Sequence, residues 1–387
     1  MAIKKKVVLF FPYSIDEAFR KKYDIKNAKK FFNIKIFDLS KIYNNYIKFN
    51  NYYPENDLNN LKKLLLKFKP DIGVMYSHDA FHKKIALFCK DTISIKMLHT
   101  NTNLIPENMI IRPKGIYLDL LISKNFFSYL FYIFKKILNL FFSEKEKIVN
   151  YNFDYSVVSG TPGKYIENVG KYIKNVKNSK KQIYICSEDY KKSFKFKIKK
   201  KNYAVFMDED LFFHRDYKRQ YREKKFVTKK YFKEMNNFFK FIEKKFELNI
   251  IIALHPKCEK KKEIKKLFNN RKCFIHKTHK LVSECKYVFV HPSTTSISIP
   301  IIFKKPLTFL VTNELMKNLE WRMRLERRKF LINQPIINVS TGEFNDYELS
   351  QNFDKRGYSY YLSLFVKSCN KKICNNSFWE DLNSSIN

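Results

Sequence analysis

Short apolar runs alternate with longer amphipathic stretches along most of the chain, a pattern that predicts strands joined by helices. In the first half, four such runs predict strands: Val7–Phe11, Ile34–Phe37, Asp71–Tyr76 and Ser156–Val158. Leu58–Phe68 has the spacing of a helix and ends just before Pro70, a residue that interrupts helices. Strands that alternate with helices usually pair in parallel, so this half predicts an α/β domain.

The same alternation is clearer in the second half. Four apolar runs predict strands there: Tyr203–Met207, Asn249–Leu254, Lys286–Val290 and Leu307–Val311. Between Tyr231 and Phe246, apolar side chains recur on one face of a helix. We therefore predict an α/β protein with two Rossmann-like domains whose parallel sheets face a cleft.

A lysine-rich stretch sets the expected domain boundaries. We expect a first Rossmann-like domain over residues 1–190, a basic linker over 191–202 and a second Rossmann-like domain over 203–345. The remaining residues, 346–387, are expected to form a C-terminal helical segment.

The chain is strongly basic, because 76 Lys and Arg residues against 37 Asp and Glu residues give a formal net charge of +39. Such a charge suggests a nucleic-acid partner, and the run Tyr190–Lys201 alternates aromatic and basic residues, which can stack on bases. However, Lys, Asn, Ile, Phe and Tyr are all abundant, as a biased composition explains, and no recognised nucleic-acid module accompanies the run. We expect no specific nucleic-acid partner.

Glycine is scarce, and this excludes two common phosphate-binding motifs. The chain has only 7 Gly, and they form neither G-x-G-x-x-G nor G-x-x-x-x-G-K-[ST]. A phosphate site in this chain therefore needs hydroxyls, helix ends, His or cationic side chains.

The cysteines and the N-terminus point to a cytoplasmic protein. The 7 Cys are odd in number and form no C-x-x-C pair, which favours reduced thiols. The apolar run Val7–Phe11 is too short for the core of a signal peptide.

The segment 118–142 is unusually apolar and aromatic, especially between Lys124 and Lys135. It is too short to span a bilayer, which takes about 20 apolar residues. It fits either a helix that lies on an anionic inner-membrane surface, making the protein peripheral there, or a buried helix of the first domain.

Polar clusters follow three strands of the second half, where ligands bind in open α/β sheets. The first cluster is Asp208-Glu209-Asp210. Crowded carboxylates raise one another's pKa, as a general base near neutral pH requires. The spacing Asp208-x-Asp210 also occurs in sites that hold a diphosphate through a divalent metal, and a solvated turn is a third interpretation.

The other two clusters are candidates for phosphate binding. His255-Pro256 follows a strand, and its imidazole can donate a hydrogen bond to a phosphoryl oxygen. After His291-Pro292, the hydroxyl-rich turn Ser293–Ser296 leads into an expected helix, where backbone N–H groups can bind an anion. Lys277-Thr278 is a candidate to close over the same site.

Together, His255-Pro256, the hydroxyl turn and the acidic cluster resemble the HP, S and D/E-D/E-G motifs of bacterial sialyltransferases and polysialyltransferases. The similarity covers Tyr203–Thr312, and the same run resembles transferases of surface-polysaccharide gene clusters. This chain departs from the acidic motif, because Asp210 and Leu211 stand where the family has its Gly.

The resemblance implies a metal-independent, membrane-associated GT-B glycosyltransferase without a cofactor. Its substrates would be a CMP-sugar and a glycan or glycolipid acceptor of lipopolysaccharide, lipooligosaccharide or capsule biosynthesis. The transferred sugar would be sialic acid, another nonulosonic acid or Kdo. Residues 1–190 would be the acceptor domain and 203–345 the donor domain, with 346–387 returning to the first domain.

The expected site combines these clusters. The catalytic residues are Asp208, Glu209 and His255; the donor-binding residues are His255, Pro256, Lys277, Thr278, His291, Ser293, Thr294 and Thr295. No metal ligands are expected. The alternatives are a UDP-sugar-dependent GT-B transferase, a UDP-sugar 2-epimerase, which the missing Gly pair at the hydroxyl turn disfavours, and a basic nucleic-acid-binding protein.

Overall fold

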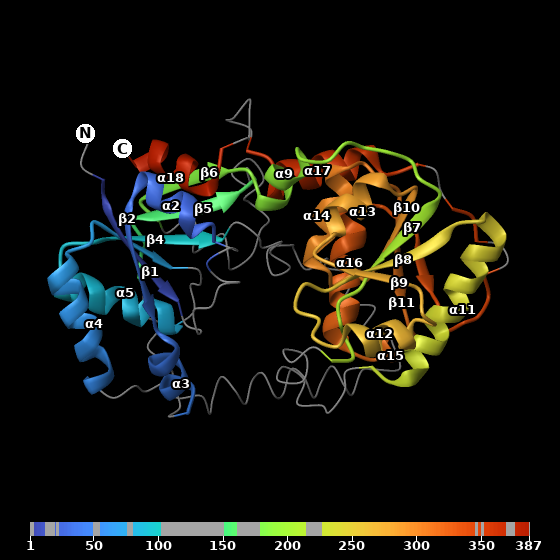
Figure 1. Cartoon of the computed structure of the whole chain (residues 1–387), viewed down its shortest axis with the longest axis horizontal. Helices are drawn as coiled ribbons and strands as arrows, with labels where there is room; N and C mark the ends of the chain where they lie inside the picture. Colours follow the sequence, from blue (N-terminus) through green and yellow to red (C-terminus); the bar gives the residue numbers. More distant parts are fainter. Residues whose placement is uncertain are drawn as a thin grey trace. The chain divides into compact units, whose positions relative to one another are not determined.

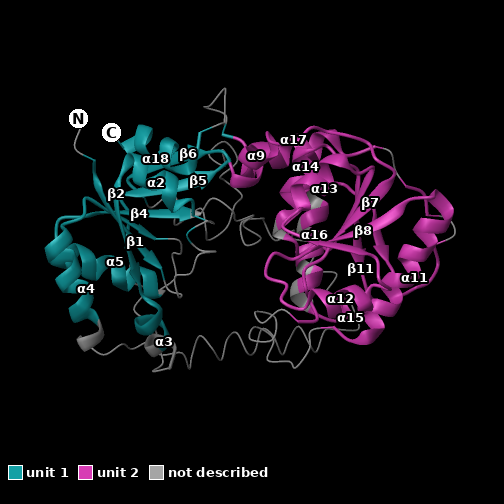
Figure 2. Cartoon of the chain, viewed as in Figure 1, with its two compact units in different colours: residues 1–186, 368–387 teal, residues 187–367 magenta. Residues whose placement is uncertain are grey.

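The computed structural model describes residues 4–11, 20, 23–48, 55–75, 80–101, 151–160, 179–213, 227–344, 347–349, 352–368 and 376–386. The chain divides into two compact units (Figure 2): residues 1–186 with 368–387, and residues 187–367. The segment 118–142 lies outside the described residues, so its predicted membrane or core position stays a prediction.

Unit 1 is built on a six-stranded parallel sheet with the order β2-β1-β3-β4-β5-β6. Its strands are β1 (Lys6–Phe11), β2 (Asn33–Asp38), β3 (Ile72–Met75), β4 (Lys96–Asn101), β5 (Tyr155–Ser159) and β6 (Lys181–Ile185). Its helices are α2 (Ile25–Phe31), α3 (Ser40–Lys48), α4 (Glu55–Phe68), α5 (Ala80–Thr92) and α18 (Phe378–Ile386).

Both faces of this sheet are covered, which explains why β1 is an apolar run rather than an alternating one (Figure 1). Val7 and Leu9 point into a core with α2 and α18, whereas Val8 and Phe10 point into a core with α3, α4 and α5. Trp379 of α18 is fully buried, and its indole N–H donates to the Tyr23 carbonyl at 2.9 Å. The last residues of the chain therefore belong to unit 1.

Unit 2 is built on a second six-stranded parallel sheet, with the order β12-β11-β10-β7-β8-β9. Its strands are β7 (Tyr203–Met207), β8 (Asn249–Leu254), β9 (Lys272–Ile275), β10 (Tyr287–Val290), β11 (Leu307–Val311) and β12 (Ile336–Asn338). Its helical segments are α9 (Glu188–Ser193), α11 (Lys229–Phe246), α12 (Lys261–Leu267), α13 (Thr278–Glu284), η2 (Thr295–Ile297), α14 (Ser298–Ile302), α15 (Asn313–Met316), α16 (Leu319–Leu331) and α17 (Lys355–Phe365).

Helix α11 supplies much of the core of unit 2. The Thr228 hydroxyl accepts from the Lys230 N–H and caps its N-terminus. Its apolar face buries Phe238 and Phe239 completely, and the Phe239 ring packs against Phe206 of β7 at 5.3 Å between centroids. Helices α11 and α12 cover one face of the sheet, and α13 and α14 cover the other (Figure 1).

Residues 191–202, expected as a linker, are docked on unit 2. The Lys199 and Lys201 N–H groups donate to the Ser283 and Glu284 carbonyls, and the buried Lys305 ammonium donates to the Lys199 carbonyl at 2.7 Å. Most of its lysine side chains are exposed, while its backbone is hydrogen-bonded within unit 2. Composition alone does not reveal such backbone contacts.

Cysteine pairing differs from the expectation at one position. Cys89, Cys258, Cys273 and Cys285 are free and buried, but Cys186 is disulfide-bonded. The odd cysteine count therefore did not mean that every thiol is reduced. Among the helices of the described residues, none is long and apolar enough to cross a membrane.

Candidate functional site

The carboxyl edge of the unit 2 sheet holds the predicted clusters. The chain runs outward from β7 through β8 to β9, then returns to the other side of β7 and continues through β10, β11 and β12. The strand order therefore reverses between β7 and β10, and ligands of open α/β sheets bind at such a switch point. Asp208-Glu209-Asp210 directly follows β7, and His291–Thr294 directly follows β10.

A side-chain hydrogen bond joins these two clusters. The Ser293 hydroxyl donates to Oε2 of Glu209 at 2.5 Å, and both residues are buried. An ionised carboxylate only accepts hydrogen bonds, so the hydroxyl is the donor. Residues far apart in the sequence thus meet at the switch point of the sheet.

Asp208 is a buried acid in a crowded position. Burial, followed by the charge of Asp210 and then that of Glu209, raises the pKa of Asp208 to about 8. The Asp210 N–H donates to Oδ2 of Asp208 at 3.1 Å. Asp210 itself has φ 55°, a left-handed conformation that Gly adopts readily and Asp tolerates. A residue other than Gly thus has a glycine-like backbone at this position.

His255 lies at the end of β8, the strand next to β7. The Lys257 N–H donates to Nδ1 of His255 at 3.2 Å, so the proton of the neutral ring is on Nε2. The Cys258 N–H donates to the His255 carbonyl at 2.9 Å and closes a tight turn around Pro256. This turn fixes the tautomer that can donate a hydrogen bond from Nε2.

His291, predicted as a donor-binding residue, is held inside unit 2 by both ring nitrogens. It is completely buried; its Nδ1 bonds to the Leu310 carbonyl at 2.7 Å and its Nε2 to the Tyr231 hydroxyl at 2.8 Å. Burial lowers the pKa of His291 to about 4, so the ring stays neutral at physiological pH. With both nitrogens engaged, His291 anchors the turn after β10, and its predicted role in donor binding stays a prediction.

The hydroxyl turn is also held by an arginine. Arg328 of α16 is almost completely buried and donates to the carbonyls of Pro292 and Thr294 at 3.0 and 3.1 Å. The Thr294 hydroxyl accepts from the Ser296 N–H at 3.3 Å and caps η2, which begins at Thr295.

The sequence prediction did not include Arg328. Its burial could have been expected, because Trp321, Leu325 and Arg328 have the i, i+4, i+7 spacing of one buried helical face.

Lys277 and Thr278 lie farther along the same edge. They follow β9, which is separated from β7 by β8, and they form the start of α13. The Lys277 ammonium lies 5.1 Å from the centroid of the Phe274 ring, a cation–π contact. Their predicted role in closing over the hydroxyl turn stays a prediction.

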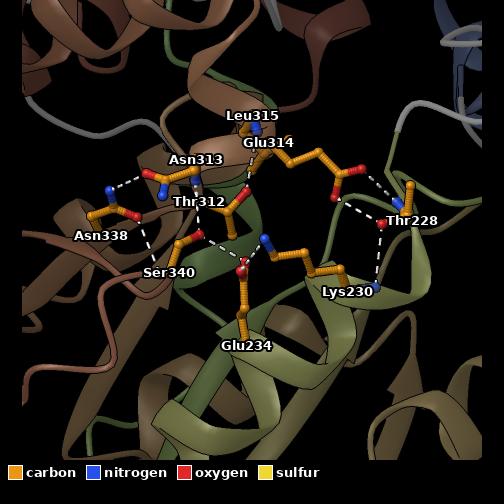
Figure 3. A network of polar contacts seen from close by, with 9 residues as sticks. All are labelled: Thr228, Lys230, Glu234, Thr312, Asn313, Glu314, Leu315, Asn338 and Ser340. Carbon is orange, nitrogen blue, oxygen red and sulfur yellow. Dashed lines mark hydrogen bonds and ion pairs between the residues drawn. The ribbon is translucent and has the colours of Figure 1, made fainter.

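A network beyond β11 and β12 was not predicted from the sequence (Figure 3). The Glu314 carboxylate accepts from both the backbone N–H and the hydroxyl of Thr228, at 3.0 and 3.3 Å. The Ser340 hydroxyl accepts from the Asn313 N–H at 2.8 Å and donates to Glu234 at 2.7 Å. Because Glu314 lies at the start of the long helix α11, the positive end of that helix dipole is already occupied by an anion.

Metal ligands are not gathered in the described part of the chain. No group of three or more His, Cys, Asp or Glu side chains there could hold a metal ion. The described carboxylate cluster is instead held by its own backbone and by Ser293.

Comparison with solved structures identifies the architecture. The Arabidopsis thaliana glycosyltransferase UGT89C1 in complex with UDP has a TM-score of 0.50 and 10% identity, with 99% of each chain covered. MurG from Acinetobacter baumannii has a TM-score of 0.48 and 9% identity over 99% of each chain. UDP-GlcNAc 2-epimerase from Methanocaldococcus jannaschii, in complex with UDP-GlcNAc and UDP, has a TM-score of 0.41 and 13% identity over 92% of this chain and 97% of that one.

No family model matches the sequence, and no curated protein is significantly similar to it. With two six-stranded parallel sheets that are flanked by helices, the protein has the α/β architecture of the GT-B fold. The fold class predicted from the sequence is confirmed.

Proposed function

We propose that the protein is a glycosyltransferase that uses a nucleotide sugar, with the phosphate of the donor bound at the carboxyl edge of unit 2. One observation carries the proposal. In a GT-B fold, the hydroxyl turn and the acidic cluster meet through Ser293 and Glu209 at the switch point of the second sheet. Hydroxyl and backbone donors suit a phosphate, and the neighbouring carboxylates suit a general base.

The proposed reaction assigns a role to each group. Asp208 takes the proton from the acceptor hydroxyl, whose oxygen forms a bond to the anomeric carbon of the sugar. The bond between that carbon and the phosphate oxygen breaks, and the nucleotide leaves with the electron pair. Nε2–H of His255 stabilises the negative charge that develops on the leaving phosphate. An acid with a pKa of about 8 is well matched to proton transfer near neutral pH.

A UDP-sugar is the first candidate for the donor. It is supported by the similarity in fold to a glycosyltransferase that was solved with UDP. A CMP-sugar is the second candidate, supported by the resemblance of His255-Pro256 and the hydroxyl turn to sialyltransferase motifs. A surface glycan or glycolipid is the proposed acceptor, and the net charge of +39 favours an anionic one.

Nucleotide binding should appear as a rise in thermal stability. A ligand that binds only the folded state at about 100 times its Kd adds about 2.7 kcal/mol, or roughly 5–10 °C for a unit of this size. We expect this shift with UDP and a smaller one or none with CMP, GDP and ADP. The shift should be the same in magnesium and in EDTA.

The controls for this measurement are uridine and cytidine, which lack the phosphate and should shift the transition much less. A shift with CMP alone would transfer the proposal to a CMP-sugar. A shift that needs magnesium would contradict metal-independent binding. If no nucleotide stabilises the protein, the proposed function is wrong.

A further inference from the structure

The segment Lys191–Lys201 exposes two large apolar side chains. Among the described residues, three large apolar side chains are exposed: Leu66 at 48%, Phe194 at 56% and Ile198 at 60%. Phe194 and Ile198 are four residues apart in this segment, whereas Leu66 lies in α4 of unit 1. A single exposed apolar residue is common on protein surfaces, so the surroundings of these two decide whether a partner covers them.

Contacts with unit 2 hold the segment in place. The Lys199 N–H donates to the Ser283 carbonyl at 2.9 Å. Between the two exposed apolar residues, the half-buried Phe196 ring stacks on the His279 imidazole of α13, with 6.1 Å between the ring centroids. The exposed side chains therefore project from an anchored backbone. A partner that binds them does not have to order the segment first, which is a cost that weakens association.

The lysines of the segment give it a local excess of positive charge. Seven of its eleven residues are Lys, and none is Asp or Glu. Two of these lysines form ion pairs within the described residues, Lys191 with Glu188 at 4.0 Å and Lys201 with Glu284 at 2.6 Å. The other five ammonium groups form no ion pair there. Charge complementarity therefore favours an anionic partner.

We propose that the segment Lys191–Lys201 docks unit 2 on an anionic lipid bilayer. Phe194 and Ile198 enter the interfacial region, and the lysine ammonium groups contact the phosphate headgroups. A bilayer fits the segment better than a nucleic acid does, because the aliphatic side chain of Ile198 gains from burial among acyl chains but does not stack on bases. The inference goes beyond the proposed function and does not depend on it.

The place of the segment in unit 2 keeps the bilayer away from the proposed donor site. The segment ends just before β7 and so reaches the amino edge of the sheet, whereas the acidic cluster and the hydroxyl turn lie at the carboxyl edge. Strand β7 has five residues. At about 3.3 Å per residue, the two edges are about 15 Å apart along this strand.

The first test measures sedimentation of the full chain with phosphatidylcholine vesicles that contain about 30% phosphatidylglycerol, an anionic lipid. The double variant Phe194→Ser/Ile198→Ser should lower the vesicle partition coefficient about tenfold or more, because two apolar side chains no longer leave water. Both positions are exposed, so we expect the fold to persist, and circular dichroism checks this.

Leu66→Ser is the matched control for the apolar contribution. Leu66 is also exposed and also has exposed lysines as neighbours, Lys62, Lys63 and Lys67, on α4. The control separates docking through the segment from the general attraction of a chain with a net charge of +39 to anionic vesicles. Leu66→Ser should stay within about twofold of the wild type.

A second measurement detects insertion directly. The two native tryptophans, Trp321 and Trp379, are buried, so their emission should not respond to lipid. In Phe194→Trp, the introduced indole should shift its emission to shorter wavelength when anionic vesicles are added, and much less with phosphatidylcholine alone. Leu66→Trp should show no such shift. Attraction by charge alone does not move an indole out of water, so this readout distinguishes insertion from adsorption.

The outcomes are decisive in both directions. Absence of vesicle binding in the wild type, unchanged binding in the folded double variant, or an equal loss in Leu66→Ser would overturn the inference. An emission that does not shift in Phe194→Trp, or that shifts equally in Leu66→Trp, would overturn it as well. Binding to single-stranded DNA that only the double variant loses, without binding to vesicles, would assign the segment to a nucleic acid instead.

These measurements are independent of the proposed function, because none of them uses a nucleotide or a sugar. If vesicle binding depends on Phe194 and Ile198 but no nucleotide stabilises the protein, the docking surface stands and the glycosyltransferase proposal fails. If a nucleotide binds but the double variant sediments with vesicles as the wild type does, the docking surface fails and the glycosyltransferase proposal stands.

Discussion

Asp208→Asn should lower the turnover number of the proposed transfer by about 10²–10⁴-fold, the usual contribution of a general base. The amide keeps the shape of the carboxyl group but cannot take a proton from the acceptor hydroxyl. In the wild type, kcat should rise with pH up to about pH 8, because the base must be ionised and burial raises its pKa to about 8. Turnover at different pH values measures both effects. Near-normal turnover of the variant would exclude Asp208 as the base.

The same substitution should change stability in a pH-dependent way. Between about pH 4 and pH 8 the unfolded chain has lost the Asp208 proton while the folded chain retains it, since the pKa rises from 3.8 to about 8 on folding. The contribution of the protonated Asp208 carboxyl to the free energy of unfolding is therefore complete below pH 4, and it is lost as the pH rises to about 8. Asp208→Asn has no such loss, so its thermal midpoint relative to the wild type should be higher at pH 9 than at pH 5.

Asp210→Asn is the control for the cause of the raised pKa. Asn tolerates the left-handed backbone that Asp210 adopts, so the turn should remain folded. Removal of the Asp210 charge lowers the pKa of Asp208, because that charge helps to raise it. The rising limb of the pH–rate profile should then move to lower pH, and an unchanged profile would contradict the assignment.

His255→Ala should lower kcat by about 10²–10³-fold, as the loss of one donor to a developing negative charge typically does. His255 lies at a half-exposed strand end, so we expect the fold to persist. Turnover and circular dichroism measure the two effects separately. His276→Asn is the matched control: His276 is exposed at the same edge, one strand farther along, and has φ 60°, which Asn tolerates. It should stay within about twofold of the wild type, and an equal loss in both variants would remove His255 from the site.

The sequence predicted the central strands of unit 2 well because they are continuous apolar runs. Tyr203–Met207, Asn249–Leu254 and Leu307–Val311 are found with the predicted bounds. The edge strands β9 and β12 were missed, since they are short and only partly buried. A strand that is covered less fully carries a weaker apolar pattern.

The sequence predicted which residues lie at the carboxyl ends of the strands. It did not predict contacts between residues that are distant in the sequence. Asp208, His255 and Ser293 each follow a strand, and the topology brings these strands together. The structural role of His291 depends on Tyr231 of α11, far away in the sequence. Such a pair follows from packing of a helix on a sheet, which no local pattern specifies.

The pattern of charged residues around Arg328 likewise did not predict that its side chain is buried. Its neighbours Arg327 and Lys329 make the helix look basic and solvated, yet Arg328 is buried against the turn. Only the apolar spacing from Trp321 distinguishes it from the exposed cations. The contacts of Glu314 in Figure 3 likewise join the starts of two helices, α15 and α11, that follow separate strands, so they too depend on the complete fold.

The central claim is that the carboxyl edge of unit 2 binds the phosphate of a nucleotide. The measurement that tests it most directly is a crystal structure of the full chain with UDP, and with CMP in a parallel experiment. Our account predicts phosphate oxygens within hydrogen-bond distance of the hydroxyl turn Ser293–Ser296, with Nε2 of His255 nearby. A nucleotide bound elsewhere, or a turn that stays empty at saturating nucleotide, would contradict it.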